Sequence, residues 1–186
     1  MADGKRILVG GGVRGGKSAF AVSVARRLGA RRVFIATAQG LDAEMCDRIS
    51  HHRRERGADF ITIEEPIELA ATLRQLADVD VVVIDCLTVW IANLLVRGLT
   101  ESMIAAQVDE FATVFVGLPF HAIVVTNEVG MGVHPESALG RTFRDVVGRA
   151  HQCLARVADE IYLAALGVIL RLRPGPVALQ PFEDHS

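Results

Sequence analysis

The residues with the clearest chemical meaning run from Gly11 to Ser18 and read GGVRGGKS. They match the pattern G-x-x-x-x-G-K-[ST], in which glycines let successive backbone N–H groups turn inward around a phosphate. In this pattern Lys17 reaches the β- and γ-phosphates, and the Ser18 hydroxyl is a ligand for Mg²⁺. The segment therefore predicts a nucleoside triphosphate site. A glycine-rich turn without a ligand is the weaker alternative.

A phosphate loop needs an acidic partner at the end of a neighbouring strand. The run VVVID supplies Asp85 directly after four apolar residues, the usual arrangement for a carboxylate that organises a metal ion. A solvated carboxylate at a strand end is the alternative. Asp80 precedes the same run, and we interpret it as ordinary surface.

The segment from Asp42 to about Arg56 adds a possible nucleophile. On a helix, one face carries Glu44, Arg48, His51 and Glu55. Asp47 lies four residues before His51 and can accept a hydrogen bond from its ring, which leaves the other ring nitrogen free to attack. Arginines that suit phosphate oxygens follow at Arg53, Arg54 and Arg56. A solvated helix face is the alternative, and the pattern alone does not choose between His51 and His52.

The sequence TNEVGMG places Asn127 and Glu128 at the end of another apolar run. Ligands of open α/β sheets gather at the carboxyl ends of the strands. These two side chains are therefore candidate substrate contacts, and a purely structural loop is the alternative.

Apolar runs alternate with helical patterns along the chain, which indicates a mostly parallel sheet with helices on both faces. A final pair of runs around Gly167 predicts an antiparallel hairpin at the sheet edge. We expect one domain over residues 1–173 and a flexible tail over 174–186. The expected strands are 6–10, 33–36, 60–63, 81–84, 121–127 and the two runs within 160–172. The expected helices are 19–28, 42–56, 66–77, 88–96, 101–116 and 137–158.

Composition limits the function classes. The chain has 186 residues, 23% charged residues and a formal net charge of -2, which gives no electrostatic reason to expect nucleic acid or an anionic membrane as a partner. Three separated cysteines indicate reduced thiols in a cytoplasmic protein. The apolar run Val79–Val96 approaches the length of a membrane span, but Asp85 would be costly at the centre of a bilayer. We therefore expect no membrane span.

Four segments together resemble the bifunctional adenosylcobinamide kinase / adenosylcobinamide-phosphate guanylyltransferase family of cobalamin biosynthesis. They are GGVRGGKS; IATAQGLDAEMCDRISHHR with TIEEP behind it; IDCLTVWIANLL; and VVTNEVGMGVHPESALGRTFRDVVGRAHQCLARVADEIYL. They lie in order and cover roughly residues 6–167. The phosphate loop is common to many families, whereas the His-His-Arg segment and TNEVGMG are far more specific.

The resemblance implies a P-loop NTPase fold of the RecA-like type and two reactions. A nucleoside triphosphate, ATP or GTP, phosphorylates the aminopropanol hydroxyl of adenosylcobinamide. GTP then gives its GMP to the product phosphate through a covalent link to a histidine, which corresponds here to His51. The resemblance also implies Mg²⁺ and a homo-oligomer, a trimer in family members. The implied nucleotide contacts are Gly11, Gly12, Val13, Arg14, Gly15, Gly16, Lys17, Ser18, Ala36, Thr37, Ala38, His52, Arg53, Arg54, Glu64 and Asp85.

The sequence departs from the family pattern at a few places. Gly15 stands where serine is common, and Phe60 stands where tryptophan is frequent. Neither change removes a residue with an evident chemical role. The alternative functions are a P-loop kinase without a covalent step and a nucleotide-binding switch. A nucleic-acid motor is disfavoured because no basic stripe is present.

Overall fold

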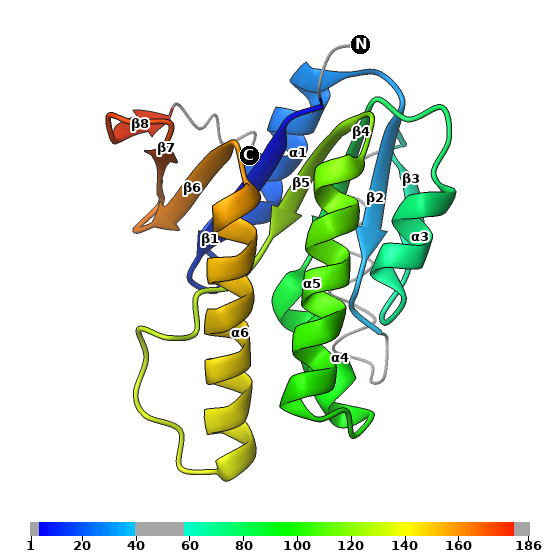
Figure 1. Ribbon diagram of the computed structural model, residues 1–186. Coiled ribbons are helices and arrows are strands. Elements are labelled where there is room, and N and C mark those ends of the chain that lie inside the picture. Colours follow the sequence, from blue (N-terminus) through cyan, green and yellow to red (C-terminus); the bar gives the residue numbers. More distant parts are fainter. Residues whose placement is uncertain (1–3, 40–57, 181–186) are drawn as a thin grey trace.

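The computed structural model describes residues 4–39 and 58–180 (Figure 1). The strands are β1 (Arg6–Gly11), β2 (Arg32–Ala36), β3 (Ile61–Glu64), β4 (Val81–Asp85), β5 (His121–Val125), β6 (Glu160–Ala165), β7 (Val168–Arg173) and β8 (Ala178–Gln180). The helices are α1 (Lys17–Leu28), α3 (Leu69–Gln75), α4 (Leu87–Val96), α5 (Glu101–Gly117) and α6 (Ala138–Val157). The helix predicted over residues 42–56 lies outside the described residues.

The described strands form one sheet in the order β3-β2-β4-β5-β1-β6-β7-β8. Neighbouring strands from β3 to β6 are parallel, while β7 and β8 are added antiparallel. Parallel strands end at the same edge, so the segments that follow β1, β2, β4 and β5 meet there (Figure 1). The predicted mostly parallel sheet with an antiparallel C-terminal hairpin is confirmed.

The alternation of side chains along each strand divides the core into two layers. On one face, Leu8, Val82 and Val124 pack with side chains of α3, α4, α5 and α6. On the other face, Val9, Val83 and Val125 pack with α1. Consecutive residues of a strand thus serve different layers, which is why the strands read as unbroken apolar runs.

Side-chain caps fix the starts of α5 and α6, where Thr100 and Ser137 accept backbone N–H groups. The start of α3 differs from the prediction, because the helix begins at Leu69 and not at Pro66. The Glu65 carboxylate accepts the N–H groups of Ile67 and Glu68 at 2.8 Å each, in a turn that precedes the helix. These bonds hold a turn where a helix was expected.

The sheet also extends beyond the expected end of the domain. We expected residues 174–186 to be flexible, but Ala178–Gln180 form β8 and pair with Ile169, Leu170 and Arg171 of β7. The open edge of β7 offers unpaired backbone groups, and a short segment satisfies them without a strong pattern of its own. The expected boundary at residue 173 therefore falls inside the sheet.

Candidate functional site

The phosphate loop connects β1 to α1, as its sequence predicts. Gly16 precedes the helix with φ of 83°, and no side chain caps the helix start. Gly11 has φ of 145°, and a Cβ there would lie 2.3 Å from the carbonyl oxygen of Ala164 on β6. Only glycine fits this position, so the loop is pressed against the sheet. An uncapped helix N-terminus behind a glycine loop is a favourable place for an anion.

Lys17 is the first residue of α1, and only 7% of it is exposed. Its ammonium nitrogen donates to the carbonyl oxygen of Gly12 at 2.6 Å, so the side chain folds back over the loop. Burial lowers the pKa of Lys17, while the nearby Asp85 carboxylate acts in the opposite direction. The charge of the predicted carboxylate thus acts on the predicted lysine, although burial has the larger effect on the pKa of Lys17.

The predicted site residues at the ends of β2, β3 and β4 are paired in register at the carboxyl edge of the sheet. Ala36 is paired in register with both Asp85 and Glu64, and Asp85 is also paired with Val125. Glu64 is exposed at the end of the outer strand. The carboxyl edge of the sheet therefore carries Asp85 on β4, one strand removed from β1 and its phosphate loop, whereas Glu64 lies on the outermost strand, β3.

Thr37 has a structural role that the sequence did not suggest. It is fully buried, and its hydroxyl donates to the carbonyl oxygen of Cys86 and accepts from the Cys86 N–H. Its backbone N–H donates to the carbonyl oxygen of Asp85, and its own carbonyl accepts from Asn93. These bonds tie the ends of β2 and β4 together. A direct nucleotide contact from Thr37 or from the following Ala38 stays a prediction.

Two oxygen donors, Ser18 and Asp85, fit the requirements of Mg²⁺. Ser18 lies in the first turn of α1, and Asp85 lies close enough to Lys17 to influence its pKa. Both residues are half-buried. Mg²⁺ takes oxygen ligands, keeps several waters and commonly binds substrate phosphates. A few protein oxygens beside a phosphate loop match that preference.

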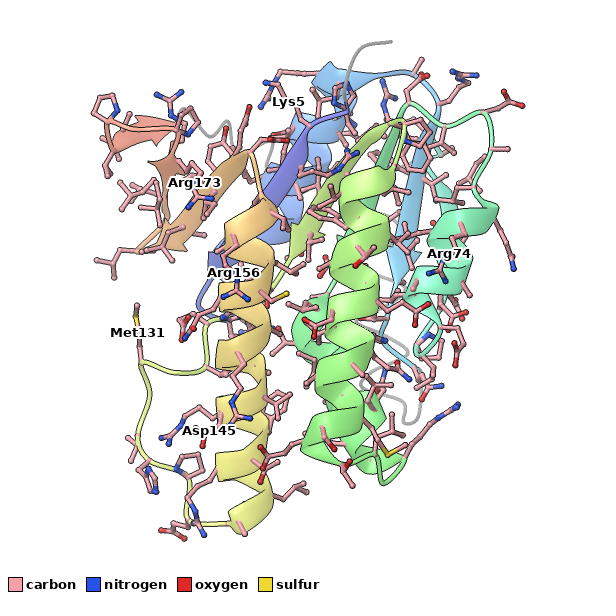
Figure 2. All side chains as sticks on the ribbon, viewed as in Figure 1. Lys5, Arg74, Met131, Asp145, Arg156 and Arg173 are labelled. Carbon is pink, nitrogen blue, oxygen red and sulfur yellow. The ribbon has the colours of Figure 1, made fainter. Side chains whose placement is uncertain are left out.

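The segment after β5 joins the phosphate loop through its backbone. The N–H of Glu128 donates to the carbonyl oxygen of Gly11 at 2.9 Å. Asn127 is anchored from the side, since its N–H donates to Thr88 Oγ1 at 2.7 Å. Figure 2 shows Met131 at the outer bend of the following loop and Lys5 at the opposite end of the sheet. The two predicted substrate contacts therefore lie at the phosphate end of the molecule.

Sequence reasoning missed a buried polar cluster behind this segment. Thr88, Thr126 and His151 come from α4, from the end of β5 and from α6, and hydrogen bonds connect them. A signal was available, because Val147, His151 and Leu154 share one helix face at positions i, i+4 and i+7. A histidine on an apolar stripe needs a polar partner when it is buried.

Several predicted residues lie outside the described part of the chain. The candidate nucleophile His51 and its neighbours His52, Arg53 and Arg54 belong to that group. Their roles stay predictions. Within residues 4–39 and 58–180, no helix is long and apolar enough to cross a membrane.

Comparison with known proteins identifies relatives along nearly the whole chain. The family model described as cobinamide kinase / cobinamide phosphate guanyltransferase matches residues 7–172. A bifunctional adenosylcobalamin biosynthesis protein, CobP of Pseudomonas aeruginosa, is 37% identical over 173 residues, covering 92% of this chain and 99% of the relative. The protein of the same description from Escherichia coli, CobU, is 36% identical over 182 residues, covering 90% and 99%.

Solved structures share the fold at low sequence identity. The RadB recombinase gives a TM-score of 0.50 at 15% identity, covering 93% of this chain and 84% of its own. A KaiC-like protein from Pyrococcus horikoshii gives 0.53 at 15% identity, covering 96% and 84%. Both likenesses concern the fold alone, and they confirm the predicted RecA-like P-loop NTPase architecture.

Proposed function

Because this chain belongs to the cobinamide kinase / cobinamide phosphate guanyltransferase family, we propose that one phosphate loop serves its two reactions and that His51 carries GMP between them. The enzyme acts in cobalamin biosynthesis, like the bifunctional relatives that it matches. Its substrates are cobinamide, cobinamide phosphate and nucleoside triphosphates. The finer assignments below are proposals.

In the kinase step, the aminopropanol hydroxyl of adenosylcobinamide attacks the γ-phosphorus of ATP or GTP. A new phosphorus–oxygen bond forms, the bond to the β-phosphate oxygen breaks, and the hydroxyl proton is lost. In the transfer step, a ring nitrogen of His51 attacks the α-phosphorus of GTP and pyrophosphate leaves. The phosphate of adenosylcobinamide phosphate then attacks the same phosphorus, which breaks the phosphorus–nitrogen bond and frees His51.

The observation that carries the proposal is the position of the Lys17 ammonium over the phosphate loop, 2.6 Å from the Gly12 carbonyl oxygen. A cation held there offsets negative charge that develops on transferring phosphoryl oxygens. Ser18 and Asp85 are the proposed Mg²⁺ ligands, and the ion would add positive charge at the phosphates. Phosphoryl transfer relies mainly on such positioning and charge stabilisation.

Further contacts complete the proposal. We propose nucleotide contacts from the loop residues, from Ala36 to Ala38, from Glu64 and from His52 to Arg54, as the family resemblance implies. Asn127 and Glu128 face the corrinoid acceptor, since their segment is bonded to the phosphate loop at Gly11. A homotrimer, an absence of nucleic-acid binding and a cytoplasmic location stay predictions.

The deciding experiment is intact-mass analysis after incubation with GTP and Mg²⁺. We expect a mass increase equal to one guanylyl group, that is GMP less one water, which cobinamide phosphate then removes. The simple kinase and the nucleotide switch both predict an unchanged mass, so an unmodified protein that still phosphorylates cobinamide would favour the simple kinase.

A further inference from the structure

His151 connects helix α6 to the segment that follows β5. Its Nε2 lies 2.7 Å from Thr126 Oγ1, and its Nδ1 lies 3.6 Å from Glu128 Oε2. The imidazole is largely buried, with 18% of the side chain exposed, and Thr126 is 2% exposed. Burial lowers the pKa of His151, and the nearby Glu128 only partly opposes this shift, so the ring is neutral at pH 7.

The contacts assign one tautomer to this neutral ring. A carboxylate faces Nδ1, and a carboxylate is stable beside a nitrogen that bears hydrogen and not beside a lone pair. The proton therefore lies on Nδ1, which leaves Nε2 as an acceptor for the Thr126 hydroxyl. Thr88 completes the series, with its Oγ1 lying 3.2 Å from Thr126 Oγ1 and accepting from the Asn127 N–H.

Glu128 is consequently held in two ways. Its backbone N–H binds the Gly11 carbonyl of the phosphate loop. Its carboxylate accepts from the Gly130 N–H through Oε1 and faces His151 through Oε2. With 27% of its side chain exposed, the carboxylate still meets solvent beside the loop. The direction of this carboxylate therefore depends on the His151 side chain of α6.

We propose that His151 is a positioning residue that acts through the Glu128 carboxylate on the corrinoid acceptor. This inference rests on the proposed acceptor contact of Glu128. The 3.6 Å approach of Nδ1 is longer than a hydrogen bond, so it guides the Oε2 side of the carboxylate electrostatically. Removing the Nδ1–H group leaves the carboxylate held by the Gly130 N–H alone, and its Oε2 side can then turn away from its place beside the loop. Nucleotide binding depends on Gly11 to Ser18 and is unaffected. The substitution therefore lowers the rate only of the steps in which the corrinoid acceptor reacts.

Two substitutions of His151 distinguish the roles of its two ring nitrogens. The amide of asparagine replaces Nδ1, whereas the longer glutamine places its amide near Nε2. His151→Asn therefore keeps a donor for Glu128, while His151→Gln keeps only the contact with Thr126. Gln152, exposed on the same helix, provides the control variant Gln152→Ala.

The test measures cobinamide phosphorylation at saturating nucleotide, with guanylylation of the enzyme by GTP as a separate readout. We expect His151→Gln to lower kcat/KM for cobinamide about 10- to 100-fold. His151→Asn and Gln152→Ala should stay near wild type, and all three should keep the wild-type KM for nucleotide. The proposed action through Glu128 is wrong if His151→Asn lowers kcat/KM for cobinamide as much as His151→Gln does. It is also wrong if the KM for nucleotide rises by the same factor as kcat/KM for cobinamide falls.

A double-mutant cycle with Glu128→Ala tests whether the two residues act as a unit. If they do, His151→Gln causes no further loss of kcat/KM for cobinamide in the Glu128→Ala background. Losses that multiply, with lowered melting temperatures, would show a general structural role and overturn the inference. If Glu128→Ala keeps the wild-type kcat/KM for cobinamide, Glu128 does not contact the acceptor and the inference loses its premise. Failure of the covalent mechanism would show separately, as a missing GMP adduct in the wild type.

Discussion

The Lys17 ammonium and the Gly12 carbonyl belong to the same loop and are joined by a 2.6 Å hydrogen bond. A bound triphosphate must compete with this carbonyl for the ammonium. The competition favours the ligand, because hydrogen bonds between charged groups are stronger than those to a neutral carbonyl. The bond therefore holds a buried cation in place while leaving it available for phosphate.

Lys17→Ala should abolish both activities, because both need a triphosphate seated in the same loop. We expect kcat/KM for each reaction to fall about 100-fold or more. The chain has one other lysine, Lys5, which pairs with Glu160 at the opposite end of the sheet (Figure 2). Lys5→Ala is thus a matched control that should keep both rates. A Lys17→Ala enzyme that transfers GMP at the wild-type rate would disprove the shared loop.

Asp85→Asn should weaken Mg²⁺-dependent turnover more than nucleotide binding. The amide keeps the size of the side chain but removes the charge that favours a metal ion. We expect the Mg²⁺ concentration for half-maximal rate to rise at least about tenfold. Rates across a Mg²⁺ titration, with nucleotide binding measured separately, test this. An unchanged metal dependence would return Asp85 to an ordinary strand-end carboxylate.

His51 should retain label from GTP that is labelled at the α-phosphate and none from GTP labelled at the γ-phosphate. The expected bond is a phosphoramidate, so acid should release the label and alkali should not. His51→Ala should abolish labelling and GMP transfer, while the kinase step continues because it needs no protein nucleophile.

His52→Ala serves as the neighbouring control for this experiment. It should weaken labelling without abolishing it, since its proposed role is a nucleotide contact. If His52→Ala loses the label and His51→Ala keeps it, the nucleophile is the second histidine of the pair.

Cys86 should resist alkylation although it adjoins the candidate metal ligand Asp85. Burial, assisted by the charge of Asp85, raises the pKa of the Cys86 thiol to about 11. At pH 8 only about one thousandth of the thiol is then ionised. Peptide mapping after iodoacetamide treatment at pH 8 should find Cys86 unmodified in the folded protein and modified in urea. Equal labelling in both states would contradict this burial.

Arg6→Lys should lower the free energy of unfolding by about 2–3 kcal/mol. The Arg6 guanidinium is buried and donates to the carbonyls of Phe120, Val116 and Leu118 at the end of α5. A lysine cannot reach the same acceptors as a planar fork. Urea unfolding measures the change. Arg74→Lys is the control, because its pair with Glu110 is exposed and should contribute less than about 0.5 kcal/mol.

Local signals predicted the sheet and the phosphate site. A buried parallel strand appears in the sequence as an apolar run, and a glycine-rich loop between such a run and a helix typically binds phosphate. Lys17 and Asp85 could therefore be predicted from short segments. The structure confirms the β1–α1 connection and places Asp85 at the carboxyl end of β4. The roles of His51 and the other site residues stay predictions.

Long-range contacts could not be predicted in the same way. The bond between Thr126 and His151 joins residues 25 positions apart, and Thr88 lies 38 positions before Thr126. No local pattern pairs such residues. The start of α3 was misplaced for another reason, because the Glu65 carboxylate binds the N–H groups of Ile67 and Glu68 in a turn ahead of the helix, and helix propensity does not register this contact.

The central place of β1 has a consequence for synthesis of the chain. Arg6 is paired with Ala122, and Gly11 is paired with Ala164, so both neighbours of the first strand come late in the sequence. On the ribosome, the nucleotide loop would emerge before β5 and β6 and would lack these supporting strands until both had been made. ATP and GTP in the cell would therefore gain a binding partner only after β6 has been made, and nascent chains that stop before β6 would be left without this source of ligand stabilisation.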